Sequence, residues 1–480
     1  MDVRSDRIRE SSRAALEDRD LQRALGRAGP LLKSMRNAGM ATLDRPEALR
    51  ERAHAVKRET MARLDEMLTL LESRIKEQGG QVHWARSADE ANRVILELAR
   101  KNRARSVVKG KSMATEEIGV NDALSRSGID VFETDLGEFI IQLAGEPPSH
   151  IAAPAIHKTR QQVSALFARH FGAEPTDSIP EMTRFARRIL RERFLAADMG
   201  ITGVNFAVAS TGTIVLFENE GNIRLTTSLP RTHVAVMGME KVIPTLEDLD
   251  VFLRLLGRSA TGQKLPSYVS LLNGPRRTGE RDGPEAFHLV ILDNGRTRIL
   301  GDPELRETLY CIKCSACLSF CPVYLQIGGH AYGWAYSGPI GSVLTPQLVD
   351  RKRACDLPYA CTLCGACAEV CPVKIDLPRL MVALRRRYQE SPEWPGPSSR
   401  VERAGMELYA KALEHPALYR LVSRLARIVQ VPFRRGDRLV HLPPPFKGWA
   451  AHRAVRPLPP RPFHSRSAGS PGHPEEVEDE

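Results

Sequence analysis

Two short stretches of the sequence repeat one cysteine pattern: Cys311-Ile-Lys-Cys-Ser-Ala-Cys-Leu-Ser-Phe-Cys-Pro322 and Cys361-Thr-Leu-Cys-Gly-Ala-Cys-Ala-Glu-Val-Cys-Pro372. Both follow the spacing C-x2-C-x2-C-x3-C-P. All nine cysteines of the chain lie between Cys311 and Cys371. A disulfide scaffold would spread its bridges through a small secreted domain, so clustered thiols in a long chain indicate a metal site.

The spacing favours 4Fe-4S clusters over zinc. Zinc is usually held by two well-separated C-x2-C pairs, whereas three cysteines at two-residue gaps reach three iron corners of one cubane. The fourth cysteine, next to proline, ligates the other cluster in two-cluster ferredoxins. The pattern therefore predicts two 4Fe-4S clusters with crossed ligation, and a purely structural cluster or a zinc site are the alternatives. Cluster 1 is expected to bind Cys311, Cys314, Cys317 and Cys371, and cluster 2 Cys361, Cys364, Cys367 and Cys321.

The spacer between the two cysteine runs contains the Gly-rich segment 327–333, followed by residues 344–357, which suit short helices. We expect a mainly helical ferredoxin-type module in which this segment packs against a cluster and its amides donate to the sulfides. The alternative is a plain Gly/Pro connector. The ninth thiol, Cys355, is interpreted as a small buried apolar residue, with a spare ligand as the alternative.

Composition limits the class of protein. The 480 residues are 42% hydrophobic and 26% charged, as in ordinary globular proteins, and the net charge is +11. The sequence lacks an apolar run long enough to span a bilayer and a secretory signal, so the expected compartment is the cytosol. It also lacks nucleic-acid-binding motifs. We therefore expect the basic surface to serve an anionic metal cofactor or a docking partner.

In the segment before the cysteines, the spacing of the apolar residues changes near Gly79-Gly80. Residues 1–78 have helical periodicity, and residues 47–78 have a regular amphipathic pattern. Further on, short apolar runs alternate with helical segments, which predicts a predominantly parallel α/β sheet covered on both faces. We expect strands over 82–84, 106–108, 131–132, 204–209, 212–218, 234–237 and 289–292, and helices over 88–100, 113–125, 156–171 and 182–198.

Several polar residues of this α/β region are candidates for chemistry. Gly110-Lys-Ser112 resembles a phosphate loop, but Arg105 stands where that motif requires glycine, so only a simple anion-binding turn over 109–112 is left. Segment 218–221 is expected to be a solvated turn, and the alternative is a carboxylate presented at a sheet edge for acyl transfer or metal binding. Without a G-x-G-x-x-G motif, a self-contained dehydrogenase is disfavoured. If the region binds a hydroxy or keto acid, Lys109, Lys111 or Arg224 would hold its carboxylate.

The region after the cysteines is expected to be helical. A helix over 377–388 precedes a Pro/Ser-rich linker at 392–400, and an amphipathic segment at 406–431 should be split in two by Pro416. Its apolar side suits core packing or partner docking, and its arginines leave peripheral attachment to an anionic membrane as the alternative. The Pro/Arg-rich end closes with an acidic run, typical of a disordered tail.

Several further stretches resemble the lactate utilisation protein B family, whose members are iron–sulfur proteins of bacterial L-lactate oxidation. The resemblance covers residues 20–460. It is carried by Lys111-Ser-Met-Ala-Thr-Glu-Glu117, Glu133-Thr-Asp-Leu-Gly-Glu138, Gln142-Leu-Ala-Gly-Glu-Pro-Pro-Ser-His150, Leu225-Thr-Thr-Ser-Leu-Pro-Arg231, Gly328-Gly-His330 and Leu363-Cys-Gly-Ala-Cys367. In this family the position of Cys361 is often serine, so the complete second run here strengthens the expectation of a conventional second cluster.

The resemblance implies an architecture and a role. It implies N-terminal helices (1–69), a LUD domain similar in fold to CoA-transferase and ribose-5-phosphate-isomerase-like α/β proteins (70–295), a dicluster ferredoxin-type module (296–390), a C-terminal helical region (391–460) and a disordered tail (461–480). It also implies electron transport from lactate oxidation to pyruvate, alongside two companion proteins and towards a respiratory-chain acceptor. A hydroxy-acid oxidoreductase site in the LUD domain, and a redox-sensing or scaffold role, are the alternatives.

Overall fold

The computed structural model describes residues 3–391, 393–394, 400–443 and 454–460. The chain divides into two compact units, Met1–Pro397 and Ser398–Glu480, and each is described by itself. In these described ranges, no helix combines the length and the apolar character that crossing a bilayer requires.

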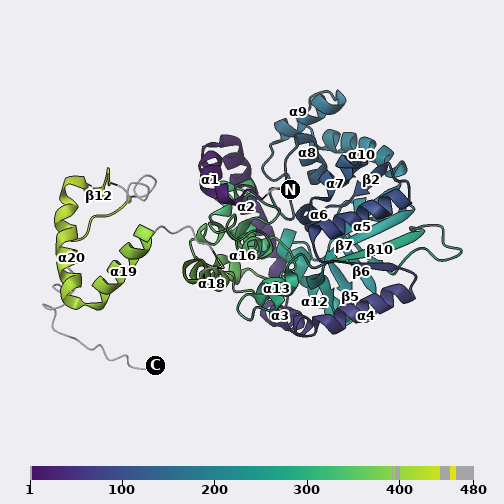
Figure 1. Ribbon diagram of the computed structural model, residues 1–480. Helices are drawn as coiled ribbons and strands as arrows, with labels where there is room; N and C mark the ends of the chain where they lie inside the picture. Colours follow the sequence, from purple (N-terminus) through teal and green to yellow (C-terminus); the bar gives the residue numbers. More distant parts are fainter. Residues whose placement is uncertain (1–2, 392, 395–399, 444–453, 461–480) are drawn as a thin grey trace. The chain divides into compact units, whose positions relative to one another are not determined.

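Six parallel strands form the central sheet of the first unit, in the order β1-β10-β7-β4-β2-β3 (Figure 1). They are β1 Gln81–Ala85, β2 Ser106–Lys109, β3 Asp130–Glu133, β4 Met199–Gly203, β7 Thr232–Gly238 and β10 Ala286–Leu292. The chain leaves β2 towards β3 on one side and leaves the adjacent β4 towards β7 on the other. This reversal makes a topological switch point, and ligands of open α/β sheets bind there, beyond the carboxyl ends of the strands.

A second, four-stranded sheet has the order β8-β5-β6-β9. Its strands are β5 Phe206–Val208, β6 Thr213–Glu218, β8 Val242–Ile243 and β9 Tyr268–Leu272, and only the β5–β8 pair is parallel. The chain passes from the first sheet to the second within two residues of Gly203. The apolar run expected as one strand over 204–209 is therefore β5, and β4 directly before it was not expected.

Helices cover both faces of the central sheet (Figure 1). They are α5 Ala88–Lys101, α6 Met113–Ile118, α7 Val120–Arg126, α8 Leu136–Ala144, α10 Ile179–Leu195 and α11 Asn222–Ser228. Helix α9 Arg160–Phe171 packs on α8, and α12 Leu246–Thr261 packs against β5 of the second sheet and against helices of the N-terminal region. The single helix expected over 113–125 is broken because Gly119 has φ 66°. The helix expected from residue 156 begins only at Arg160, where Thr159 and Gln162 form a capping box. Sequence analysis expected no helix at α8, α11 or α12.

The N-terminal helices share one apolar core with the α/β region and the cysteine module. They are α1 Ile8–Glu17, α2 Arg19–Met40, α3 Pro46–Ala62 and α4 Leu64–Glu77. The segment expected to be one helix over 47–78 is interrupted at Arg63. The shared core joins Leu71 of α4, Met237 of β7 and Leu318 of the cysteine module.

The cysteine module is helical, as expected. Its elements are η3 Arg306–Tyr310, α14 Ala316–Phe320, α15 Tyr324–Ile327, η4 His330–Tyr332, α16 Gly338–Leu348, η5 Leu357–Tyr359, α17 Ala366–Glu369 and α18 Leu377–Glu390. Helices α14 and α15 pack against α2, and α15 also packs against α1 (Figure 1). The buried positions 309, 318, 344 and 384 tie these short helices together.

The second unit contains α19 Arg400–Glu414 and α20 Pro416–Val429, followed by a hairpin of β11 Arg434–Arg435 and β12 Arg438–Leu439. The split expected at Pro416 is confirmed, because this proline starts α20 as its first residue. The tail expected over 461–480 lies outside the described residues.

Candidate metal centre

The two cysteine runs have matching backbone conformations. In the first run Lys313 and Ser315 have φ values of 60° and 65°, and in the second Leu363 and Gly365 have 54° and 82°. These left-handed residues flank the second cysteine of each run, and the short helices α14 and α17 follow them. The structure thus contains an internal repeat that the spacing alone indicated.

Backbone amides point at the sulfurs in both runs. The N–H of Lys313 lies 3.4 Å from Cys311 Sγ, and that of Leu363 lies 3.3 Å from Cys361 Sγ. The last cysteine of each run also accepts an amide: Tyr324 N–H lies 3.4 Å from Cys321 Sγ and Ile375 N–H 3.4 Å from Cys371 Sγ. Hydrogen bonds of this kind favour the thiolate form that iron requires.

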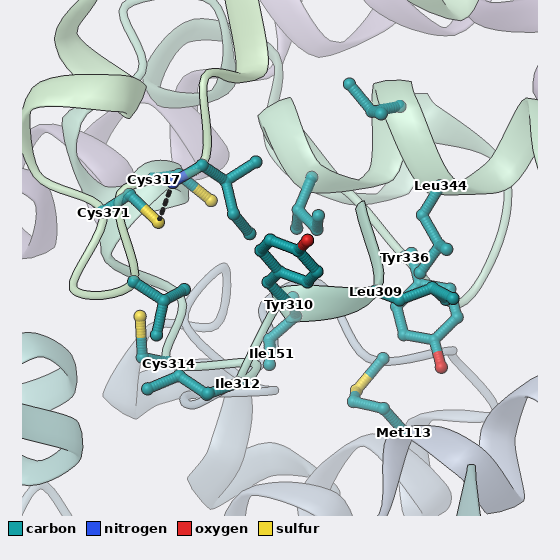
Figure 2. Packing of buried hydrophobic residues seen from close by; sticks show 14 of the residues in the cluster. Met113, Ile151, Leu309, Tyr310, Ile312, Cys314, Cys317, Tyr336, Leu344 and Cys371 are labelled. Carbon is teal, nitrogen blue, oxygen red and sulfur yellow. Dashed lines mark hydrogen bonds between the residues drawn. The ribbon is translucent and has the colours of Figure 1, made fainter. Parts of the chain in front are cut away.

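The eight thiols fall into two groups that each mix the two runs. A small cavity is lined by Cys311, Cys314, Cys317 and Cys371 together, and Figure 2 shows three of these side chains beside Tyr310 and Ile312. The thiols that act electrostatically on Cys321 are Cys361 and Cys364, and those that act on Cys367 are Cys361, Cys321 and Cys364. Cys317 also has a neighbour in the other group, Cys367.

Burial and mutual repulsion oppose ionisation of these thiols. Burial, with Cys371 and Cys311 nearby, raises the pKa of Cys314, and burial with neighbouring thiols raises the pKa of Cys367 to about 12. Burial likewise raises the pKa of Cys371 to about 11. Buried thiols that repel one another as thiolates need a compensating cation, and iron supplies that charge when the sulfurs coordinate it.

The spacing of the sulfurs fits a cluster better than a single ion. Four thiolates about 2.3 Å from one zinc ion would lie about 3.8 Å from each other. Among the described residues, the sets of three or more potential ligand atoms within 4.8 Å of one another include no cysteine. A cubane holds its four thiolates farther apart, because each binds a different iron. Donor type, number and separation therefore fit 4Fe-4S clusters.

The Gly-rich segment has a different environment from the one expected. Gly329 packs against the backbone of Ser149, where a Cβ would lie 1.7 Å from the carbonyl oxygen, and its N–H donates to Ser149 Oγ. Of this segment, Tyr332 is the residue whose raised pKa, caused first by burial, also reflects Cys321. The segment thus joins the module to the α/β region, and the hydrogen bonds described for it involve none of the eight cysteine sulfurs.

Cys355 lies apart from the eight thiols. It is half-buried against the apolar core, and the charged groups that act on it are Asp356 and Arg9. This environment fits the interpretation as a packing residue.

A cavity of about 320 Å³ lies beyond the carboxyl ends of β2, β4 and β7, at the switch point. Residues of β6 and α12 line one side of it. The cysteine module lines another, through Lys313, Cys314 and Tyr336. The cavity therefore lies between the α/β region and the group of thiols that contains Cys314.

A buried ion-pair network forms the inner wall of this cavity. Arg296 donates two hydrogen bonds of 2.8 Å to Glu117 and one of 2.6 Å to Glu240, and Tyr336 donates its hydroxyl to Glu117 at 2.6 Å. Burial alone would raise the pKa of Glu240, but Arg296 holds it at about 2. Lys57 donates to the backbone oxygen of Glu240, and burial lowers the pKa of this lysine to about 7.

Two further lysines, Lys241 and Lys313, line the cavity near this ion-pair network. Burial lowers the pKa of Lys241 to about 8. The ammonium group of Lys313 lies 4.4 Å from the ring centre of Tyr336. Sequence reasoning missed Lys241, Arg296 and Lys313 as cavity residues because only the fold brings them together. Lys241 and Arg296 stand in no recognisable motif, and Lys313 lies inside the first cysteine run, whose pattern indicates only the thiol ligands.

Of the three residues that were expected to hold a carboxylate, two do not have the expected position or free charge. Lys109 is fully buried and paired with Glu133 at 2.8 Å and Glu116 at 3.0 Å, so its charge is already used inside the protein. Arg224 does not line the cavity. Lys111 does line it, and donates to the carbonyl of Ile151.

Segment 218–221 is a turn in which Asn219 and Glu220 are exposed, and it also contributes carboxylates to the cavity. Glu218 accepts the N–H groups of Ile223 and Arg224 at 2.7 and 3.0 Å, and it lines the cavity together with Glu220. Burial, with Asp135 nearby, raises the pKa of Glu220 to about 7. The cavity thus has a basic end at the module and an acidic end at this turn.

Comparison with known families defines the class. Residues 68–292 match the family described as LUD domain, residues 307–375 the 4Fe-4S dicluster domain, and residues 387–469 the C-terminal region of lactate utilisation protein B. The fold and the site thus define an iron–sulfur protein in which a parallel α/β LUD domain is joined to a 4Fe-4S module and a helical C-terminal region.

Relatives identify the family. "Lactate utilization protein B" of Shouchella clausii (strain KSM-K16) is 45% identical over 445 residues, which cover 92% of either chain. The protein of the same name from Bacillus cereus (strain AH820) is 45% identical over 90% of this chain and 91% of its own. The chain belongs to the lactate utilisation protein B family. A solved DUF162 family protein from Deinococcus radiodurans is 17% identical, covers 48% of this chain and 98% of its own, and has a TM-score of 0.27.

Proposed function

We propose that this chain carries electrons in the oxidation of L-lactate to pyruvate, through two 4Fe-4S clusters. The observation that supports this most strongly is the pair of four-thiol groups in an internal repeat, in a chain 45% identical to proteins named for lactate utilisation. Oxidation of a hydroxyl to a carbonyl releases two electrons and two protons. When bound, each cluster exchanges one electron at a time, so two clusters match the two electrons of one turnover.

The proposed ligand sets keep the crossed arrangement. Cluster 1 is held by Cys311, Cys314, Cys317 and Cys371, and cluster 2 by Cys361, Cys364, Cys367 and Cys321. The shared cavity of the first set and the thiol neighbours of Cys321 and Cys367 support the assignment. The crossing also places parts of both runs around each cluster, which brings the two clusters close together.

The protein's own residues prepare the two sites differently. Arg50 donates to the carbonyl of Cys371 at 2.8 Å, and the Arg385 side chain donates to that of Cys361 at 2.9 Å. Both carbonyls belong to the second run, but each proposed ligand set contains one of these two cysteines and so has an arginine from a neighbouring helix beside it. The buried surroundings of Cys314 and Cys317 exclude water, whereas Cys364 is exposed. Electrons therefore have an outlet at the protein surface next to Cys364.

The proposed partners are two companion lactate-utilisation proteins and an acceptor in the respiratory chain; no nucleic acid is included. We place the protein in the cytoplasm, with peripheral contact at the inner face of the membrane. Exposed apolar side chains of α20, including Leu425 and Ile428, and arginines on the same helix support such contact. The proposed domain boundaries are those expected from the sequence, 1–69, 70–295, 296–390, 391–460 and 461–480.

Reconstitution tests the proposed function. The chain is purified without oxygen, its clusters are counted, and L-lactate is added with and without the two companion proteins. Lactate should bleach the visible absorbance of the clusters when the companions are present. Cys355→Ser is the matched control, because it removes a thiol outside both ligand sets and should bleach like the parent. Absence of bleaching in a cluster-replete mixture would contradict a role in lactate oxidation.

A further inference from the structure

The cavity at the switch point is lined by as many carboxylates as cations, but its charges are not all joined in ion pairs. At the basic end, Arg296 is compensated by Glu117 and Glu240. Among the residues that the structure describes, no ion pair joins Lys241 or Lys313 to a carboxylate. Both lysines line the cavity, so an anionic ligand would gain charge-assisted hydrogen bonds there.

The opposite end of the cavity offers acceptors. Glu218 and Glu220 line it, and Asp135 lies beside Glu220. These groups would repel a second carboxylate but would accept a hydrogen bond from a hydroxyl. A ligand suited to both ends therefore has an anionic group at one end and a hydroxyl donor at the other.

The walls leave room for such a ligand. A Cβ at Gly203 would lie 2.5 Å from Ser112 Oγ, and a Cβ at Gly238 would lie 2.1 Å from Glu240 Oε2. The two glycines, at the ends of β4 and β7, let Ser112 and Glu240 close the strand ends. The remaining volume of about 320 Å³ lies within the size range of small-molecule sites.

We propose that this cavity binds a small hydroxycarboxylate, with its carboxylate between Lys241 and Lys313 and its hydroxyl towards Glu218 and Glu220. Because Cys314 lines the same cavity, the ligand lies beside cluster 1. The binding site stands on the cavity itself, and only its connection to electron transfer rests on the proposed function. No redox step is assigned to the chain alone.

Lys241 and Lys313 have a second possible task, which the test must separate from ligand binding. The thiolate of Cys311 acts electrostatically on Lys241, so this lysine could serve only to balance the charge of cluster 1. In that case removal of the lysine would change the spectrum of the cluster, and no hydroxycarboxylate would bind.

Equilibrium dialysis with radiolabelled L-lactate tests the proposal on the cluster-replete chain under argon. L-lactate should bind, propionate, which lacks the hydroxyl, should bind more weakly, and uncharged lactamide weakest of all. Lys241→Met should weaken lactate binding about tenfold to a hundredfold, as expected for the loss of one charge-assisted hydrogen bond. Lys76→Met, which removes the same charge from the exposed surface of α4, should leave binding unchanged.

A second variant keeps the charges and removes the space. Ala260 of α12 lines the cavity, and Ala260→Leu should weaken lactate binding at least tenfold while the low-temperature EPR spectrum of the reduced clusters stays that of the parent. Lactate that binds no better than lactamide, or that binds to both variants as tightly as to the parent, would overturn the proposal. A change in the EPR spectrum of Lys241→Met without lactate binding by the parent would also overturn it. A chain without iron would instead overturn the proposed function.

Discussion

The two thiol groups differ in their surroundings. The group proposed for cluster 1 has three buried cysteines, a wall shared with the α/β cavity, and cations close by, since Arg36 acts on Cys314 and Arg50 on Cys371. The group proposed for cluster 2 includes the exposed Cys364 and the half-buried Cys361, and Leu363 between them is 40% exposed. One repeated sequence motif has thus produced an inner and an outer site.

From this difference in burial we expect electrons to pass through the module from the inner site to the outer site. The inner site adjoins a cavity that can hold a small molecule, and the outer site adjoins the surface, where a partner protein can approach. Burial, nearby charge and hydrogen bonds set the potential of an iron–sulfur cluster, so unequal surroundings should give the two clusters unequal potentials.

Removal of one inner ligand should halve the metal content. Cys314→Ser should reduce the iron from about eight to about four atoms per chain, because each set of four thiolates holds one cubane. Iron analysis and low-temperature EPR of the anaerobic protein measure this. Cys355→Ser is the control and should retain the full amount. Unchanged iron and an unchanged spectrum in Cys314→Ser would contradict the ligand assignment.

Disruption of the link between the α/β domain and the inner site should destabilise the protein strongly. Glu117→Gln leaves Arg296 partly uncompensated in a buried position and should cost about 3–5 kcal/mol of unfolding free energy. Anaerobic denaturant unfolding measures the loss. Glu90→Gln breaks an exposed pair with Arg86 and should have little effect. Equal losses in the two variants would show that the buried link carries no special stability.

Mildly acidic pH should lower the unfolding free energy through His233, which lies in β7 of the central sheet. Burial, with His288 nearby, lowers the pKa of His233 to about 3 in the folded protein, whereas the unfolded value is about 6.5. Between these values the unfolded chain binds a proton that the folded chain does not, so stability falls as the pH drops below 6.5. At pH 5 the loss from this group is about 2 kcal/mol.

Unfolding at pH 7 and pH 5 tests this prediction. His233→Gln should reduce the difference in unfolding free energy between the two pH values. A variant with the same difference as the parent would show that His233 does not contribute to it.

The sequence predicted the site better than its surroundings. The cysteine spacing predicted the repeated backbone conformation and the 4Fe-4S type of cofactor, because a short motif encodes its own local geometry, whereas the crossed ligand sets stay a prediction. Most of the apolar runs that were expected to be strands are strands in the structure. β4 was missed because glycines at positions 200 and 203, which allow Thr226 and Ser112 to approach, weaken the strand pattern.

The cavity could not be predicted from local patterns. Lys111, Lys241 and Lys313 stand far apart in the chain, and only the strand order and the docking of the module bring them to one space. Lys109, by contrast, stood in the turn that was expected to bind an anion, but it forms ion pairs with Glu133 and Glu116 inside the protein. The position of a charged residue near a motif therefore did not show whether that residue forms an ion pair inside the protein.

The iron and acid-labile sulfide content of the chain tests the central claim most directly. Protein prepared under strict exclusion of oxygen should be brown and should contain about eight irons and about eight sulfides per chain. A colourless preparation, or one with zinc in place of iron and sulfide, would contradict the account.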